Sequence, residues 1–176
     1  MTANIELVDA THFGTHVVTT AHIYGEAMRR PPELVVQRRE IMASHVHRPG
    51  FVGVLARDDD DIVGFGYGYR GRPGDWWHDV VAKALGRRDA REWLADSFEL
   101  AELHVLPPSQ GHGVGRQILE TLLTKIDATT TVLSTHDRES PARALYRSVG
   151  FVDLLTGFVF PGSSEVYVVM GRRNVD

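Results

Sequence analysis

The sequence predicts an α/β fold built on a central mixed, mostly antiparallel sheet. Runs of alternating apolar and polar residues, typical of half-buried strands, are separated by runs with helical apolar spacing. They occur in the order β-α-α-β-β-β-α-β-α-β-β. Most strands in the middle of the chain are hairpin-connected and should pair antiparallel. The strands at 98–106 and 130–135 flank a helix and should be parallel.

The length and composition suit one domain. With 176 residues, 43% of them hydrophobic, the chain can build a core of its own. We therefore expect a single domain over residues 1–176, in which residues 72–97 form a helical insertion between two strands.

The first third of the chain predicts a strand at 4–8 and two helices. The first helix is expected to be capped by Thr11 and to begin near Phe13. Pro31-Pro32 ends it and opens the second, which Pro49-Gly50 stops. The expected inner faces of the two helices are Phe13, Val17, Ala21, Tyr24 and Met28, and then Leu34, Val35, Arg38, Ile41, Met42 and His45.

A hairpin follows, with strands at 51–58 and 61–71. The acidic run Asp58–Asp61 between them is typical of a solvated turn rather than a metal site. Every second residue from Gly64 to Gly68 is glycine, so another element is expected to pack closely against the backbone on that face.

The insertion at 72–97 has two short helical patterns. The first contains Trp77, Val80, Val81, Ala84 and Leu85, and the second contains Arg91, Trp93 and Leu94. We expect these residues to pack as core, and the insertion to form part of an acceptor-site wall or a dimer contact.

The second half is predicted to contain a strand, a helix, a strand, a helix and two strands, at residues 98–106, 113–127, 130–135, 140–150, 151–160 and 164–170. The second of these helices has the clearest ends. Ser140 is a favoured N-cap, Pro141 suits the first helical position, and Gly150 suits the position after the end.

The composition argues against several classes of function. A net charge of −4, without clusters of Lys and Arg, gives no support for a nucleic-acid partner and is a mild indication of cationic substrates. The chain has no cysteine, which excludes a disulfide framework, a thiolate zinc site and a cysteine nucleophile. His12 and His16 have the spacing of metal ligands on a helix but lack a third ligand, so no metal is expected.

The N-terminus lacks the basic and apolar regions of a signal peptide. No apolar run approaches the roughly 20 residues that a membrane span needs. We therefore expect a cytoplasmic protein that has no membrane partner.

The stretch LHVLPPSQGHGVGRQILETLL at 103–123 places three glycines between a strand and a helix. Glycine weakens a helix start, but it lets a ligand approach the unpaired N–H groups there, which together with the helix dipole attract an anion. A P-loop is excluded because no Lys-Ser/Thr pair follows the last glycine, and the spacing is wrong for a dinucleotide fingerprint. A tight turn without a ligand is the remaining alternative.

Gln110-Gly111-His112-Gly113-Val114-Gly115 matches the pattern [Q/R]-x-x-G-x-[G/A]. It resembles the acyl-CoA signature of the GNAT superfamily of N-acetyltransferases. A second stretch, ARALYRSVGF at 142–151, resembles the A-x-x-L-Y-x-x-x-G-F helix of that family. Two motifs in register, with a compatible element order, imply a GNAT-type fold.

The resemblance implies acetyl-CoA as the acyl donor. Backbone N–H groups of residues 111–116 would hold the pyrophosphate, and the cofactor-binding residues in this loop would be Gln110, Gly111, His112, Gly113, Val114, Gly115 and Arg116. Val105 and Leu106 would bond the pantetheine arm from a strand that bulges and splays from its neighbour at 130–135. Tyr146 would contact the CoA sulfur and protonate the leaving thiolate.

Attack by an amine on a thioester also benefits from a general base. An alkyl amine has a pKa of about 10.4 and attacks a thioester only when neutral. Glu99 is the favoured base, because several family members place a base at the matching position. Glu102 and His104 are alternates, and no base is needed if the amine arrives deprotonated.

The acceptor side is less defined. The resemblance suggests Tyr24 and Met28 near the end of the first helix, and we add Trp77 from the insertion. Many family members have an Asn that contacts the pantetheine arm, and Glu139 stands at the matching position here.

We therefore expect an N-acetyltransferase that transfers an acetyl group to a primary amine of a small molecule or protein. Because no cysteine can carry the acetyl group, the amine should attack directly in a ternary complex. The alternative is a non-catalytic acyl-CoA-binding or sensor module, which would need neither Tyr146 nor a base. A homodimer is also compatible with the sequence.

Overall fold

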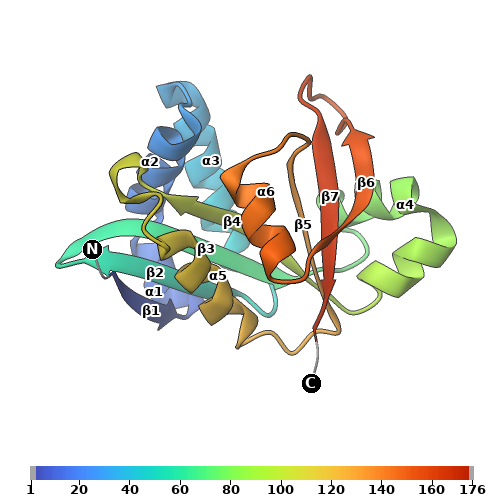
Figure 1. Ribbon diagram of the computed structural model, residues 1–176, viewed down its shortest axis with the longest axis horizontal. Helices are drawn as coiled ribbons and strands as arrows, with labels where there is room; N and C mark the ends of the chain where they lie inside the picture. The colour runs from blue at the N-terminus through green and yellow to red at the C-terminus, as the bar shows by residue number, and fades with distance from the viewer. Residues whose placement is uncertain (1–2, 175–176) are drawn as a thin grey trace. The chain divides into compact units, whose positions relative to one another are not determined.

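The structure is a computed structural model that describes residues 3–174. Contacts divide the chain into two compact units. The first covers the chain up to Tyr69 together with Leu100–Ile126, and the second covers Arg70–Glu99 and the chain from Asp127 onward. The expectation of a single domain over residues 1–176 stays a prediction. Figure 1 labels the elements, whose hydrogen-bonded strand order is β1-β2-β3-β4-β5-β7-β6.

The first unit contains most of the helical layers. Its elements are β1 (Asn4–Val8), α1 (Ala10–Thr15), α2 (Val17–Met28), α3 (Pro32–His45), β2 (Val52–Asp58), β3 (Asp61–Arg70) up to Tyr69, the end of β4 (Ser97–Val105), the short 3-10 helix η1 (Pro107–Ser109) and α5 (Val114–Leu123). Strand β2 pairs antiparallel with both β1 and β3, so the predicted hairpin is confirmed.

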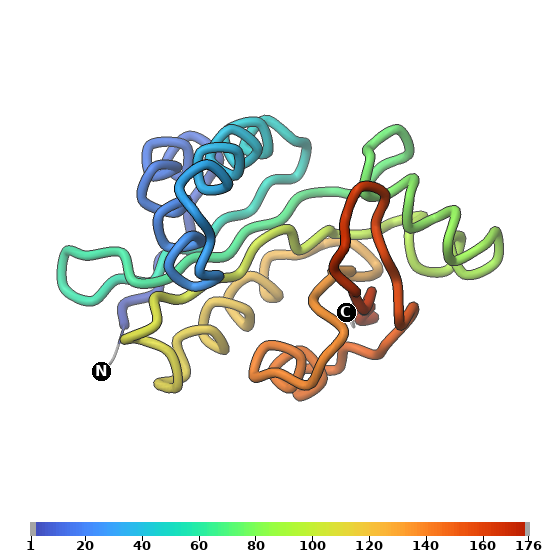
Figure 2. Tube along the Cα trace, turned by 90° about the horizontal axis from the view of Figure 1, so that it is seen from above, coloured from blue at the N-terminus to red at the C-terminus, as the bar shows by residue number. Residues whose placement is uncertain are grey.

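The glycines of β3 have the role that their alternation predicts. A Cβ atom on Gly64 would lie 3.1 Å from Ile118, and one on Gly66 would lie 2.7 Å from the same side chain. Helix α5 therefore packs directly on this face of β3. In Figure 2, α2 and α3 lie on the opposite face of the β2–β3 hairpin.

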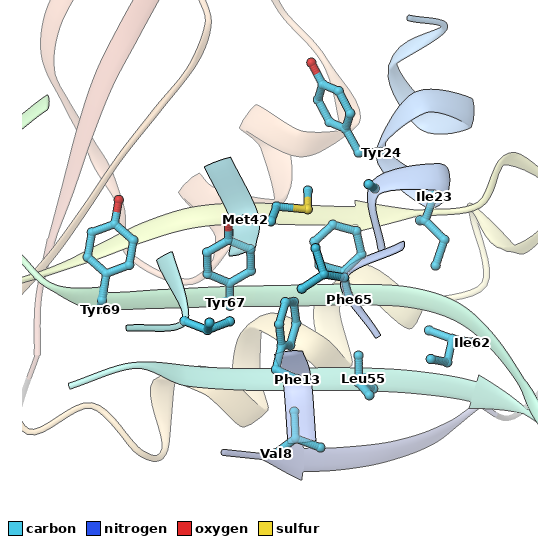
Figure 3. Packing of buried hydrophobic residues seen from close by; sticks show 13 residues of the cluster. Val8, Phe13, Ile23, Tyr24, Met42, Leu55, Ile62, Phe65, Tyr67 and Tyr69 are labelled. Atoms are coloured by element: carbon cyan, nitrogen blue, oxygen red, sulfur yellow. The ribbon is translucent and has the colours of Figure 1, made fainter. Parts of the chain in front are cut away.

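The core of the first unit lies between that opposite face and α1–α3. Phe13, Phe65 and Met42 are fully buried there, and Phe13 and Tyr67 make an edge-to-face contact with ring centroids 5.0 Å apart. Figure 3 shows Phe65, Tyr67 and Tyr69 projecting from the same face of β3.

Three expectations about the first helices are corrected. Asp9, not Thr11, is the N-cap, because its side chain accepts a hydrogen bond from the N–H of His12 at 2.8 Å. The predicted helix is also divided at His16, whose φ of −108° ends α1 before α2 begins. In α3, Leu34 and Ile41 are exposed rather than buried, so its inner face is narrower than the apolar pattern indicates.

The second unit contains the start of β4 and the rest of the chain. Its other elements are α4 (Trp76–Leu94), β5 (Thr130–His136), α6 (Pro141–Ser148), β6 (Val152–Phe158) and β7 (Tyr167–Arg173). Ser97–Glu99 of β4 pair in parallel with Thr130–Val132, as predicted, and β7 pairs antiparallel with β5 and β6.

Helix α4 is the predicted helical insertion. It stands between β3 and β4 and adds a helix to the element order expected from the sequence. It bends at Gly86, whose φ of 79° separates two helical segments, as the two sequence patterns indicate. Val81 is fully buried, and Trp77 packs against the same cluster, which includes Val132 of β5 and Val169 of β7. The helix after the glycine loop ends at Leu123, earlier than the sequence pattern predicts.

Candidate active site

The glycine loop between β4 and α5 is exposed, and it has an open surface. Gly111 and Gly113 have φ values of 78° and 82°, a region that side chains rarely adopt. A Cβ atom on either would meet nothing within 4 Å. The backbone conformation requires these two glycines, and a ligand can approach the chain directly at both.

The amides at the start of α5 receive no hydrogen bond from an N-cap side chain. Gly113 is the N-cap and has no side-chain cap hydrogen bond, and the first turn contains no acidic residue. The amides at this end point outward and carry the positive end of the helix dipole. The loop and the helix start together fit a phosphate group.

The end of β4 is fixed on the loop side. The Gln110 side chain donates from Nε2 to the Val105 carbonyl at 2.9 Å. The Leu106 N–H donates to Val63 at 2.8 Å, and the Leu106 carbonyl accepts from the Ser109 N–H at 2.8 Å. Since consecutive residues of a strand direct their N–H groups to opposite sides, that of Val105 faces away from β3. Gln110 thus orders the loop, and Val105 is the better placed of the two residues to pair with a ligand.

A buried ionic network lies on β4 in the first unit. Glu102 is 6% exposed at its side chain, and its Oε1 accepts from Arg38 Nη1 at 3.1 Å. Its Oε2 lies 2.6 Å from His104 Nε2. Burial alone would raise the pKa of Glu102, but the hydrogen bond and charge of His104 and the charge of Arg38 outweigh it, so the pKa lies below its ordinary value.

Aromatic rings enclose this network. The His104 ring lies edge-on to Tyr24, with centroids 5.3 Å apart, and 5.6 Å from the Phe65 ring. The Arg38 guanidinium lies 5.0 Å from the centroid of the Tyr24 ring. Tyr24 and Phe65 are among the residues labelled in Figure 3.

The two candidate carboxylates do not lie together in one described unit, since Glu99 belongs to the second and Glu102 to the first. Glu99 is buried and packs against Gly71. A Cβ atom added to Gly71 would lie 2.7 Å from Oε1 of Glu99. Ala101 and Glu102 are adjacent, yet Ala101 packs against the α1–α3 core and Glu102 reaches α3. The strand therefore departs from strict alternation here, as a bulge does.

Tyr146 is buried on α6 in the second unit. Its ring packs edge-to-face on Phe151, with centroids 5.7 Å apart. As predicted, Ser140 caps the helix by accepting from the Arg143 N–H at 3.2 Å. Arg143 also donates to Asp137 at 2.7 Å and to Asp153 at 2.8 Å. These ion pairs fix the helix that positions Tyr146.

A model of the acetyltransferase (GNAT) domain matches residues 49–153, well over half of the chain. The chain belongs to the GNAT acetyltransferase family. The match includes the glycine loop, Glu102 and His104 of β4, and Tyr146.

Known acetyltransferases resemble this GNAT domain in sequence or in fold. A GCN5-like protein acetyltransferase of Mycobacterium tuberculosis is 29% identical over 180 residues, covering 85% of this chain and 87% of the relative. The structure of yncA from Salmonella typhimurium, which holds its cofactor acetyl-CoA, has a TM-score of 0.69 at 15% identity and covers 100% of this chain and 96% of its own. The ribosomal-protein-S18-alanine N-acetyltransferase from Escherichia coli has a TM-score of 0.68 at 18% identity, covering 99% and 96%. These structural matches show the shared fold.

The residues of the GNAT domain that the sequence predicts for the acceptor side, and Glu139, lie in both units of the structure. Tyr24 is buried beside His104 and Arg38, and Met28 is half-buried against the same core. Trp77 donates from Nε1 to Ser134 at 3.1 Å in the second unit. Glu139, at the position of the family's Asn, pairs with Arg147 at 3.0 Å.

Arg38 and Arg143 are the charged residues whose roles sequence reasoning missed. Each interrupts an apolar helical pattern, which is a signal for a buried ion pair, but the partners of Arg38 lie far away in sequence. Within residues 3–174, no group of three or more His, Asp or Glu side chains is arranged to hold a metal ion. None of the helices in this range is both long and apolar enough to cross a membrane.

Proposed function

We propose that this GNAT domain transfers the acetyl group of acetyl-CoA to a primary amine by direct attack in a ternary complex. The observation that carries the proposal is the loop at Gly111 and Gly113, where positive φ values and open Cβ directions precede an uncapped helix start. An open, glycine-lined turn of this kind fits a phosphate-bearing ligand.

The proposed donor contacts are mainly backbone groups. The amides of residues 111–116 hold the pyrophosphate, and His112, Val114 and Arg116 stay candidate contacts through their positions in the loop. Val105 offers its N–H to the pantetheine arm. Leu106 has backbone groups that already bond Val63 and Ser109, so we expect its contact to be apolar. When bound, acetyl-CoA supplies the thioester that the amine attacks.

Two proton transfers accompany the reaction. Tyr146 is the proposed acid that protonates the leaving thiolate, and its fixed position on α6 suits this role. We place the acceptor of the amine proton on β4, among Glu99, Glu102 and His104. A group that takes this proton raises the fraction of neutral, nucleophilic amine.

The acceptor is proposed to be a primary amine of a small molecule or a protein. Tyr24, Met28 and Trp77 are the residues proposed to contact it. The relatives support both classes, since they include a protein acetyltransferase and an aminoglycoside 6'-acetyltransferase. Cytoplasmic location, a homodimer and the lack of nucleic-acid or membrane partners stay predictions.

Calorimetric titration with acetyl-CoA, followed by assay of CoA release, tests the proposal. The panel contains spermidine, kanamycin, a peptide with a free N-terminal alanine, and the same peptide acetylated at its N-terminus with one internal lysine. Because the chain has no cysteine, 4,4′-dithiodipyridine detects only the thiol of CoA. Binding with turnover of at least one amine is expected. Absent binding would refute the proposal, and binding without turnover on the whole panel would favour the sensor module.

A further inference from the structure

We propose that His104 is the base that accepts the proton of the acceptor amine, and that Glu102 and Arg38 are positioning residues that hold its ring. The inference rests on the proposed acetyltransferase function and names the base for that reaction. It departs from the sequence-based preference for Glu99.

The hydrogen bonds of Glu102 define which nitrogen of His104 can accept a proton. Oε1 accepts from Arg38 Nη1 at 3.1 Å, and Oε2 lies 2.6 Å from His104 Nε2. An ionised carboxylate only accepts hydrogen bonds, so Nε2 is the donor in this pair. The neutral imidazole then has its lone pair on Nδ1.

Glu102 itself is poorly suited to be the base. Both of its oxygens already accept hydrogen bonds, and the side chain is 6% exposed. His104 and Arg38 outweigh the effect of burial and keep the pKa of this carboxylate below its ordinary value. A carboxylate stabilised in its charged form has little tendency to take a proton from an amine.

His104 is more accessible than the carboxylate that orients it. Its side chain is 14% exposed, and among residues 3–174 its hydrogen bond is made through Nε2 and none through Nδ1. The titratable and charged groups around it are Glu102 on β4, Arg38 and His45 on α3, Tyr24 on α2 and Tyr67 on β3. Tyr67 is hydrogen-bonded to His45 at 2.9 Å, and Arg38 to Glu102, so both are already engaged.

The position along β4 is also suitable. His104 directly precedes Val105, whose N–H is the proposed contact for the pantetheine arm. Consecutive Cα atoms are about 3.8 Å apart, so a base at 104 stays within a side chain's length of the strand position that carries the arm. No other titratable residue is adjacent to Val105 in the sequence.

The proposed step is balanced. His104 Nδ1 takes one N–H proton from the ammonium, and the freed nitrogen lone pair forms a bond to the thioester carbonyl carbon. The C–S bond then breaks, and the thiolate takes a proton from Tyr146. The amide nitrogen loses its second excess proton to solvent as the tetrahedral intermediate collapses. Proton exchange with water returns His104 and Tyr146 to their starting states, and the net products are amide, CoA thiol and one released proton.

The test compares the pH dependence of kcat/KM for four variants, using the panel amine that the wild-type protein turns over fastest. For His104→Gln we expect a loss of about 10²–10³-fold near neutral pH, with a rate that keeps rising with pH as the amine itself deprotonates. Glu102→Gln should shift the ascending limb to lower pH, because the ring loses a negative partner. Glu99→Gln tests the other candidate base on β4, and the exposed control His47→Gln should keep the wild-type profile.

Two further measurements separate a chemical role from a structural one. Acetyl-CoA affinity, measured by calorimetry, should stay unchanged in His104→Gln, and added imidazole should restore turnover to His104→Ala but not to Glu102→Gln. A wild-type profile in His104→Gln, or the loss of the limb in Glu99→Gln or Glu102→Gln instead, would overturn the inference while leaving the transferase function intact. No turnover by the wild-type protein with any panel amine would refute both.

Discussion

Glu102 and His104, two residues apart on one strand, are joined by a 2.6 Å contact between Oε2 and Nε2, and the same carboxylate accepts from Arg38 on a distant helix. The network links β4 to α3 across 64 residues of sequence. It makes a charged residue part of the interior of the first unit. Its consequences can be measured through the free energy of unfolding, the pH dependence of that free energy, and the kinetics of the reaction.

Removing Arg38 should destabilise the protein by about 2–3 kcal/mol, because the buried Glu102 carboxylate would lose a charged hydrogen-bond donor. Urea unfolding of Arg38→Met measures the loss. Arg39→Met, at an exposed neighbouring position, is the matched control and should change stability little. The double variant with Glu102→Gln should be more stable than Arg38→Met alone, and additive losses would contradict the buried pair.

Acid should remove the contribution of Glu102. Its pKa in the folded protein lies below the ordinary value of 4.5, so the unfolded chain binds the proton more readily. The stabilisation is complete above that value and is lost as the pH falls through the folded pKa. The stability difference between the wild-type protein and Glu102→Gln should therefore shrink as urea titrations move from pH 7 to below pH 4.5. A constant difference over this range would argue against an ionised Glu102.

Gly113→Val should abolish acetyl-CoA binding, because the side chain would occupy the open approach to the helix start and strain a φ of 82°. Gly162 offers a matched control, with a φ of 83° and nothing within 4 Å of an added Cβ. Gly162→Val should show similar backbone strain, measured by thermal unfolding, with unchanged affinity in calorimetry. Equal affinity losses in both variants would refute the loop assignment.

Tyr146→Phe should lower kcat by about 10²-fold or more and leave acetyl-CoA affinity within a few-fold, since the hydroxyl is proposed to act only on the leaving thiolate. Tyr167→Phe is the control, because its hydroxyl donates to Glu165 at 3.0 Å and has no proposed catalytic part. Steady-state CoA release and calorimetry give the two readouts. A loss of binding that equals the loss of rate would remove the acid role from Tyr146.

Much of the fold could be predicted because its signals are local. Ser140, Pro141 and Gly150 define α6 through capping chemistry that needs no distant partner, and the structure confirms this cap. The alternating glycines of β3 likewise predict close packing on that face, and the structure shows that Ile118 of α5 packs there. The break at His16 was missed because an apolar face that repeats in helical register continues across it.

The sequence by itself determined the family motifs and the phosphate-type turn, because glycine backbone freedom and helix-end amides act within a few residues. Only the tertiary structure decided the ionisation and partners of the β4 side chains. Glu102 faces the α1–α3 side through an irregularity in strand alternation, and Arg38 comes to it from a helix 64 residues earlier. Such a pairing depends on how distant elements pack. That packing places Glu102 where it can hold the His104 ring, and it leaves His104 Nδ1 as the proposed proton acceptor.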